Sequence, residues 1–140
     1  MNRKPRFTKQ RKLILDELKK VKTHPTAQEL YDSIRKVLPN ISLGTVYRNL
    51  ELLCQQGMAK RVEFPEAQRR YDGDVSRHYH IQCVGCGKVD DIYVNETRAI
   101  REDELIRFLG IKTNYDVHGQ KIDFFGLCPE CKSRKNQEKL

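Results

Sequence analysis

The 140-residue sequence has no apolar run long enough to cross a membrane, and no apolar stretch of signal-peptide type follows its basic N-terminus. A membrane-spanning helix needs about 20 mostly apolar residues, and a secretory signal needs an apolar segment behind its basic end. We therefore expect a cytoplasmic protein with no membrane partner. Internal repeats and low-complexity segments are also missing, and 38% hydrophobic residues can support one compact domain or two small ones.

Acidic residues are outnumbered by basic ones, which leaves a net charge of +8. Such an excess favours polyanionic partners, although a solvated basic surface explains the total equally well. The positions of the charges favour a nucleic acid, because basic residues crowd the first dozen positions: Arg3, Lys4, Arg6, Lys9, Arg11 and Lys12.

The first half of the chain predicts three helices followed by a β-hairpin. Helical apolar spacing covers residues 8–21, with Thr8 as N-cap. Thr26 and Glu29 form a capping box for a helix over residues 27–38. Ser42 caps a third helix that ends at Gly57. Residues 59–64 and 68–72 flank a Pro-Glu-Ala turn. This order is typical of a winged helix-turn-helix domain, whose recognition helix enters the DNA major groove.

The third helix and its neighbours carry the candidate contacts to double-stranded DNA. Hydroxyl groups and a guanidinium near the start of that helix suit base edges and phosphates, and basic residues on the first helix and the hairpin suit the backbone. The alternative is a plain three-helix domain with a solvated basic face. The predicted DNA-binding residues are Arg11, Lys12, Ser42, Thr45, Tyr47, Arg48, Lys60 and Arg61.

The second half of the chain predicts a small domain of helices and strands. Short strands are expected at residues 80–83, 88–94, 111–117 and 121–127, with a helix over 95–109 capped by Asn95 and a frayed helix from Pro129. The expected fold class is α+β. We expect a winged-helix domain over residues 1–72, a hinge at 73–77, and a second domain over 78–140.

Four of the five cysteines form two Cys-x-x-Cys pairs, at Cys83, Cys86, Cys128 and Cys131. Four thiolates in a tetrahedron make the usual closed structural Zn²⁺ site, which would join the start of the second domain to its end. The alternatives are four unrelated buried thiols, or a redox dithiol of a thiol-disulfide or peroxidase enzyme. Cys54 has no such partner and is interpreted as a small apolar side chain.

A His-x-His pair, His78 and His80, places two imidazoles on one face of a strand. His24, Asp72 and Asp91 are further candidate ligands. From spacing alone only the pair is suggestive, and a lone His24 is more often a loop or capping residue. A zinc-dependent hydrolase is the enzymatic alternative, but it needs an open metal position and a general base, for which no unassigned carboxylate is available. We therefore expect no enzyme activity.

Over nearly its whole length the chain resembles the ferric uptake regulator (Fur) family. The motifs that carry this resemblance occupy residues 24–27, 45–50, 70–72, 78–80, 83–88 and 126–131. The resemblance implies a homodimeric, metal-dependent repressor whose second domain is a dimerisation domain with the four cysteines on structural zinc. It also implies a regulatory Fe²⁺ or Mn²⁺ site at the hinge, made by His24, Asp72, His78, His80 and Asp91.

The two aspartates make the chain similar to the peroxide-responsive (PerR) type within that family, whereas iron sensors more often carry glutamate there. Tyr79 also differs from the acidic residue that iron sensors often have between the histidines. The resemblance implies that peroxide is the only small molecule involved, and that it reacts at bound iron and oxidises His24 or His78. The alternative is an iron or manganese uptake regulator without oxidation chemistry. Gln120, in place of a frequent histidine, makes a third metal site near His118 doubtful, and Lys9 replaces a frequent proline.

Overall fold

The computed structural model describes residues 8–93 and 101–138, and its contacts divide the chain into two compact units, Met1–Ser76 and Arg77–Leu140. The division falls within the segment 73–77 that the sequence predicts as a hinge. The early basic residues Arg3, Lys4 and Arg6, and the predicted cap Asn95, lie outside the described residues. Among those described, no helix is long and apolar enough to cross a membrane.

Three capped helices form the first unit: α1 (Lys9–Lys20), α2 (Ala27–Ile34) and α3 (Leu43–Gln55). Each begins where a hydroxyl side chain accepts a hydrogen bond from a backbone N–H three residues later, and these N-caps are the predicted Thr8, Thr26 and Ser42. The helix α3 stops at Gln56, and Gly57 follows in the left-handed conformation with φ 74°.

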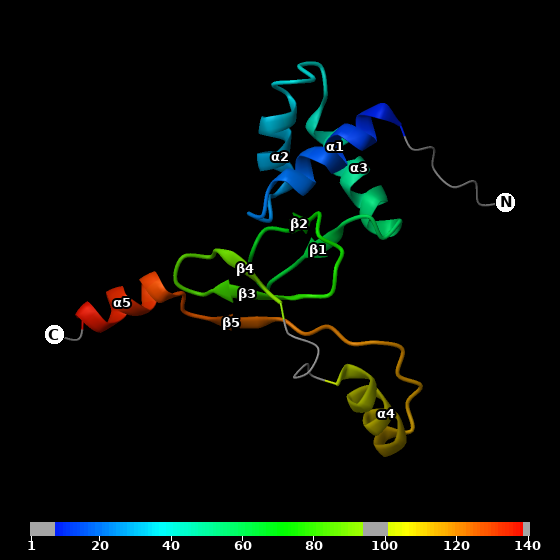
Figure 1. Cartoon of the computed structure of the whole chain (residues 1–140), viewed down its shortest axis with the longest axis vertical. Helices are drawn as coiled ribbons and strands as arrows, with labels where there is room; N and C mark the ends of the chain where they lie inside the picture. The colour runs from blue at the N-terminus through cyan, green and yellow to red at the C-terminus, as the bar shows by residue number, and fades with distance from the viewer. Residues whose placement is uncertain (1–7, 94–100, 139–140) are drawn as a thin grey trace. The chain divides into compact units, whose positions relative to one another are not determined.

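The apolar faces of these helices meet in one core, which includes the fully buried Ile14, Leu18, Ile34 and Leu50. A two-stranded antiparallel sheet closes the unit, formed by β1 (Lys60–Val62) and β2 (Arg70–Asp72) in the register Lys60↔Asp72. The buried ring of Tyr71 joins this hairpin to the helical core. Figure 1 shows the resulting order of three helices and a wing, which confirms the predicted winged helix.

The second unit is built on a three-stranded sheet in the order β4-β3-β5. The central strand β3 (Tyr79–Cys83) pairs antiparallel with β4 (Val89–Ile92) and parallel with β5 (Phe124–Gly126). Two helices, α4 (Glu102–Thr113) and α5 (Pro129–Glu138), have no buried residue. The sheet and helices together give the expected α+β class.

Several predicted boundaries are wrong. The helix α2 ends at Ile34 rather than at residue 38, and a turn follows in which the N–H groups of Val37 and Leu38 both donate to the Ile34 carbonyl. Residues 111–113 belong to α4 rather than to a strand, and no strand covers 114–117. The apolar alternation there forms no ladder with a described strand, and residues 111–113 extend the helix instead. The last predicted strand shortens to Phe124–Gly126.

Candidate functional site

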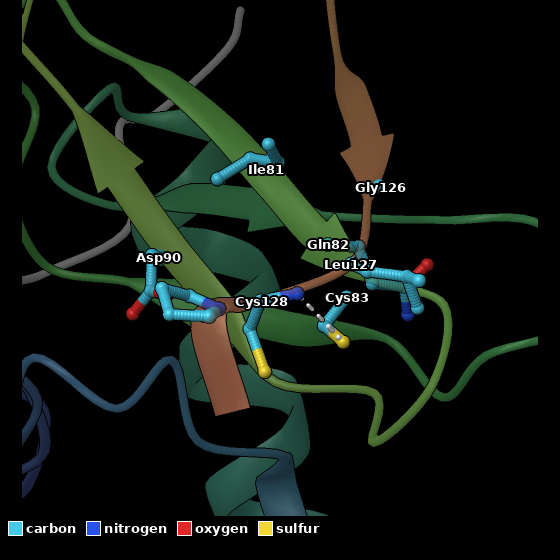
Figure 2. A pocket seen from close by; sticks show the side chains of 8 residues that line it. Ile81, Gln82, Cys83, Asp90, Gly126, Leu127 and Cys128 are labelled. Atoms are coloured by element: carbon cyan, nitrogen blue, oxygen red, sulfur yellow. Dashed lines mark hydrogen bonds between the residues drawn. The ribbon is translucent and has the colours of Figure 1, made fainter. Parts of the chain in front are cut away.

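The four paired cysteines come together at one end of the second unit. Cys83 ends β3 and Cys86 lies in the turn after it, whereas Cys128 and Cys131 lie around the start of α5. The parallel pairing of β3 with β5 sets Cys83 opposite Gly126, so both strands deliver their cysteines to the same end of the sheet. Figure 2 shows Cys83 and Cys128 side by side at the edge of a cavity of about 130 Å³.

The geometry of the cysteine cluster fits a tetrahedral metal ion. All four sulfur atoms lie within 4.8 Å of one another, and Cys86 Sγ lies 3.9 Å from Cys128 Sγ. Four thiolates at about 2.3 Å from a central ion are about 3.8 Å apart, which matches that spacing. The absence of a side chain at Gly85 leaves room for the cluster, because a Cβ atom there would approach Cys131 Sγ to 3.0 Å.

Backbone N–H groups surround the sulfur atoms and favour the thiolate form of Cys83. The N–H groups of Cys128 and Gly85 each donate to Cys83 Sγ at 3.3 Å. Hydrogen bonds from the backbone, that of Cys128 foremost, lower the pKa of Cys83 to about 6. Hydrogen bonding with the neighbouring thiol groups, first that of Cys128, raises the pKa of Cys131 to about 12. A cluster in which one thiol ionises at the expense of another needs a cation before all four can be thiolates.

A second set of candidate metal-ligating side chains lies at the sheet of the second unit, with His78 directly before β3, His80 within β3 and Asp91 on β4. His78 and His80 point to the same face, and their Nε2 atoms are 3.1 Å apart. The register His80↔Asp91 brings the Asp91 carboxylate beside them. Asp91 Oδ1 lies 3.2 Å from His78 Nε2 and 3.2 Å from His80 Nε2. We name this triangle of two nitrogens and one oxygen the sheet triad.

The sheet triad has the dimensions of one face of a coordination octahedron. Ligands at about 2.2 Å from an octahedral ion are about 3.1 Å apart, which agrees with the edges of 3.1, 3.2 and 3.2 Å. Two histidines and one carboxylate arranged in this way are the usual facial ligands of non-haem Fe²⁺, and they leave the opposite face of the ion for other ligands.

The first unit contributes a separate pair, His24 and Asp72. His24 Nε2 lies 3.4 Å from Asp72 Oδ2, and both side chains are buried. His24 has φ 53°, a left-handed backbone conformation that is costly for a residue with a Cβ atom. Arg70 stabilises it by donating a hydrogen bond to the His24 carbonyl at 3.1 Å. The N–H of Asp74 donates to Asp72 Oδ1 at 2.8 Å, which directs Oδ2 toward His24.

The candidate DNA-binding residues of α3 occupy its N-terminal end. Ser42, Tyr47 and Arg48 are exposed and Thr45 is half-buried. The hydroxyl groups of Ser42 and Thr45 are hydrogen-bonded to each other at 2.8 Å, and Arg48 Nη2 donates to Thr45 Oγ1 at 3.3 Å. Donors and one cation therefore line the first two turns of the helix, where its dipole also favours an anion.

Outside α3, the predicted cations have different environments. Lys12 is exposed on α1, whereas Arg11 is buried and its Nε donates to Asn49 Oδ1 on α3 at 2.9 Å. Arg11 thus connects α1 to α3. Lys60 Nζ donates to the Ser76 carbonyl at 3.1 Å, and Arg61 binds the carboxylate of Glu51.

Sequence reasoning missed Asn49 and Glu51 as organising residues of α3. Asn49 accepts from Arg11 and donates to the Thr45 carbonyl at 2.9 Å. Glu51 accepts hydrogen bonds from three side chains of the wing region, Arg61, Arg69 and Tyr71. The helical pattern of the sequence could not indicate these roles. Every partner except Thr45 lies at least ten residues away along the chain.

A winged helix followed by a small α+β unit with a four-cysteine metal cluster defines a class of metal-dependent transcription regulators. Residues 2–118 match the sequence profile of the Ferric uptake regulator family, and the chain belongs to that family. It is therefore a metal-dependent regulator of the Fur type, as the sequence resemblance implied.

Individual relatives agree with this assignment. The chain is 34% identical over 131 residues to the peroxide-responsive repressor PerR of Staphylococcus epidermidis, an alignment that covers 94% of this chain and 84% of the relative. The crystal structure of the Campylobacter jejuni peroxide stress regulator aligns with a TM-score of 0.69 at 31% identity, over 87% of this chain and 88% of that one. The Helicobacter pylori ferric uptake regulator aligns with a TM-score of 0.72 at 27% identity, over 91% of this chain and 82% of that one.

Proposed function

We propose that the chain is a DNA-binding repressor that is activated by Fe²⁺ or Mn²⁺ and inactivated by peroxide through iron-dependent oxidation of a ligand histidine. The observation that carries this proposal is the sheet triad, whose three ligand atoms lie 3.1 to 3.2 Å apart and match one face of an octahedral ion. Mixed nitrogen and oxygen ligands suit Fe²⁺ or Mn²⁺, whereas the all-sulfur cluster suits Zn²⁺.

The proposed regulatory site combines the sheet triad with His24 and Asp72. Five protein ligands would then come from both units of one chain, and a sixth position would stay open to a small molecule. Binding one ion in this way would favour one relative orientation of the winged helices in a homodimer, which shifts the population toward the form that binds DNA. Support comes from the 3.4 Å spacing of His24 and Asp72 and from the family to which the chain belongs.

The Cys83, Cys86, Cys128 and Cys131 cluster is proposed to hold Zn²⁺ in a structural role. Its sulfur spacing fits a closed tetrahedron, which leaves no position for a substrate. In DNA binding, we propose that α3 reads the major groove through Ser42, Thr45, Tyr47 and Arg48, while Lys12 and Lys60 contact phosphates. Arg11 and Arg61 are also predicted contacts, but Arg11 is buried and Arg61 is paired with the Glu51 carboxylate, which favours a supporting role for both.

The peroxide reaction balances without a further reductant. One oxygen atom of H₂O₂ inserts into a ring C–H bond of His24 or His78, and the other leaves as water, so the imidazole loses two electrons and the peroxide gains them. Bound iron supplies the redox chemistry that activates the peroxide. The oxidised ring would be a poorer ligand, so the site would lose its metal and repression would end. Each chain reacts once, so the protein acts as a sensor rather than as an enzyme. It would act in the cytoplasm, where the chromosome lies.

Mass spectrometry of the metal-loaded protein tests the proposal. The zinc-containing full chain is loaded without oxygen with Fe²⁺ or Mn²⁺, treated with one equivalent of H₂O₂, and digested. A duplex selected by the Mn²⁺-loaded chain from a randomised DNA library reports binding. The Fe²⁺ form should gain one oxygen atom on the peptide of His24 or His78 and release the duplex, while the Mn²⁺ form should change in neither respect.

His118 is an internal control, because it is exposed and lies outside the five proposed ligands. Equal oxidation of His118 would indicate reaction in bulk solution rather than at a bound ion. If the Fe²⁺ form keeps unmodified histidines and full DNA affinity, the chain is instead an uptake regulator that responds to iron or manganese alone. The alignment with the Helicobacter pylori ferric uptake regulator favours that second function as the alternative.

A further inference from the structure

One carboxylate on the recognition helix collects hydrogen bonds from the whole wing region. Glu51 lies two turns beyond the N-terminal end of α3 that faces DNA in the proposed function. It accepts from Arg61 Nε of β1 at 2.9 Å, from Arg69 Nη1 at 3.1 Å and from the Tyr71 hydroxyl of β2 at 2.7 Å. Three groups separated from Glu51 by 10 to 20 positions thus converge on a single side chain.

Two further contacts extend this arrangement. Arg69 Nε lies 2.6 Å from Glu63 Oε1, which ties the segment before β2 to the residue after β1. The ring of Tyr47, one helical turn before Glu51, packs edge-on against Tyr71 with centroids 6.4 Å apart. Hydrogen bonding to Arg61 lowers the pKa of Glu51 to about 2, so the carboxylate is ionised at neutral pH. We name Glu51, Arg61, Arg69 and Tyr71 the wing clamp.

The charges of the clamp balance locally. Arg61 and Arg69 are both within ion-pair distance of Glu51, and Arg69 also pairs with Glu63. Two cations therefore meet two anions beside the recognition helix. A guanidinium held by carboxylates in this way has fewer N–H groups available for phosphate, and it cannot leave its partner without a cost in hydrogen bonding.

A cavity of about 250 Å³ opens beside the clamp. One side is formed by Leu43 and Tyr47 of α3, and another by Gln68 and Arg69 of the wing turn. The distance between these sides depends on how the wing sits against the helix, and Arg69 belongs both to the cavity and to the clamp. Loss of the clamp would therefore alter the surface that the helix and wing present together.

We propose that Glu51 is a positioning residue for DNA recognition, which holds the wing against the recognition helix and reserves Arg61 and Arg69 for the protein rather than for phosphates. This inference rests on the proposed DNA-binding function. It assigns to an acidic residue a role in binding a polyanion. It also changes the expected role of Arg61 from a direct DNA contact to a residue that holds the wing in position.

Simple electrostatics and the wing clamp predict opposite effects for Glu51→Gln. Removal of a negative charge near DNA should strengthen binding if charge alone matters. If the clamp positions the wing, the variant should bind the selected duplex about tenfold more weakly, the effect of losing one hydrogen bond to a charged group. The matched control is Glu17→Gln on α1, which makes the same charge change where Glu17 pairs with Lys20 of its own helix. The control should bind as tightly as the wild type or slightly more tightly.

A double-mutant cycle separates support from direct contact. The Mn²⁺-loaded full chain and its variants Glu51→Gln, Arg61→Gln and the double variant are titrated with the same duplex at several salt concentrations. If Arg61 acts through Glu51, the double variant should bind as tightly as the weaker of the two single variants. The salt dependence of binding should then be unchanged. If Arg61 contacts phosphate directly, the losses should add, and the slope of log K against log salt should fall by about 0.9 for Arg61→Gln. That second pattern overturns the inference.

Folding is followed by circular dichroism, and Tyr71→Phe provides a milder variant that removes only the hydroxyl from the clamp. It should show a smaller loss of affinity in the same direction. Binding by Glu51→Gln and Tyr71→Phe at wild-type strength would overturn the inference while leaving the proposed function intact. Failure of the wild-type chain to select any duplex would instead overturn the proposed function itself.

Discussion

The Nε2 atoms of His78 and His80 lie 3.1 Å apart on one face of the sheet, and the rings meet edge to face with centroids 4.7 Å apart. Two ring nitrogens rarely lie so close without a shared proton or a shared cation. The Asp91 carboxylate faces both of them, which adds an anionic oxygen ligand to the two nitrogens. These separations agree with the proposed role of the sheet triad as three ligands of one ion.

Neighbouring aspartates give a sharp test of the sheet triad. Asp91 faces the two histidines, whereas Asp90 lies on the next position of β4 with an exposed side chain that pairs with Lys88 at 3.4 Å. Replacement of Asp91 by Asn should weaken Mn²⁺ binding by at least about tenfold, because the carboxylate of the triad is removed. Isothermal titration of the zinc-containing chain measures this affinity.

The control for that measurement is Asp90→Asn, which makes the same chemical change on the opposite side of the strand. Its Mn²⁺ affinity should stay at the wild-type value. If both variants bind Mn²⁺ with the same affinity, whether weakened or unchanged, the triad is not the Mn²⁺ site.

The cysteine cluster predicts a loss of zinc and of folding in Cys128→Ser. Among the residues of the second unit that the structure describes, few are apolar and buried, so a metal that joins β3 to α5 would supply much of the unit's stability. The variant should retain far less zinc after gel filtration with a chelator, as measured by elemental analysis, and should unfold at a lower temperature.

Cys54→Ser is the matched control for the cysteine cluster. Cys54 is half-buried in the first unit, and burial raises the pKa of its thiol to about 11, so it is a poor metal ligand. Zinc content should not change in this variant. Full zinc retention by Cys128→Ser would contradict the four-cysteine site.

Sequence reasoning succeeded where structure depends on neighbours along the chain. The caps Thr8, Thr26 and Ser42 were predictable because a hydroxyl reaches an N–H three residues away in any helix start. The Cys-x-x-Cys spacing likewise brings two thiols into one turn wherever the turn lies.

The failures have the opposite cause. The sequence predicted a strand at residues 111–117 from alternation, but a strand exists only with a hydrogen-bonded partner, and neither described sheet includes this segment. The left-handed backbone of His24 and the convergence of the wing on Glu51 come from contacts across the fold. Helical spacing could place Glu51 on a face of α3, but it could not show which side chains of the wing would reach that face.

The exposed apolar face of α4 predicts a dimer that one substitution can break. The helix has no buried residue, and Phe108 and Ile111 are 58% and 77% exposed. A helix of this length is marginal in water unless its apolar face is covered, and family membership favours a second copy as the cover. Phe108→Glu should raise the dimer dissociation constant by at least about a hundredfold, because two buried rings are lost at a symmetric interface. Sedimentation equilibrium measures the change.

Val37→Glu is the corresponding control, since Val37 is 59% exposed in the turn that follows α2 in the first unit. It adds the same charge to an apolar position of equal exposure, and the dimer should persist. A wild-type chain that sediments as a monomer, or a Phe108→Glu variant that stays dimeric, would contradict this use of α4.

The pKa of Glu51 predicts how acid weakens the wing clamp. Because folding lowers this pKa from the ordinary glutamate value of 4.5 to about 2, the ionised carboxylate stabilises the folded state above about pH 4.5. That stabilisation is lost as the pH falls from about 4.5 through about 2, where the group takes up a proton in the folded state as well. The free energy of unfolding of the wild type should therefore exceed that of Glu51→Gln at pH 6 and converge toward it near pH 2. Denaturant titrations of both full chains at each pH measure the difference, and acid releases metal from both alike, so that their comparison isolates the clamp. A difference that is independent of pH would mean that the amide and the carboxylate differ in packing rather than in charge.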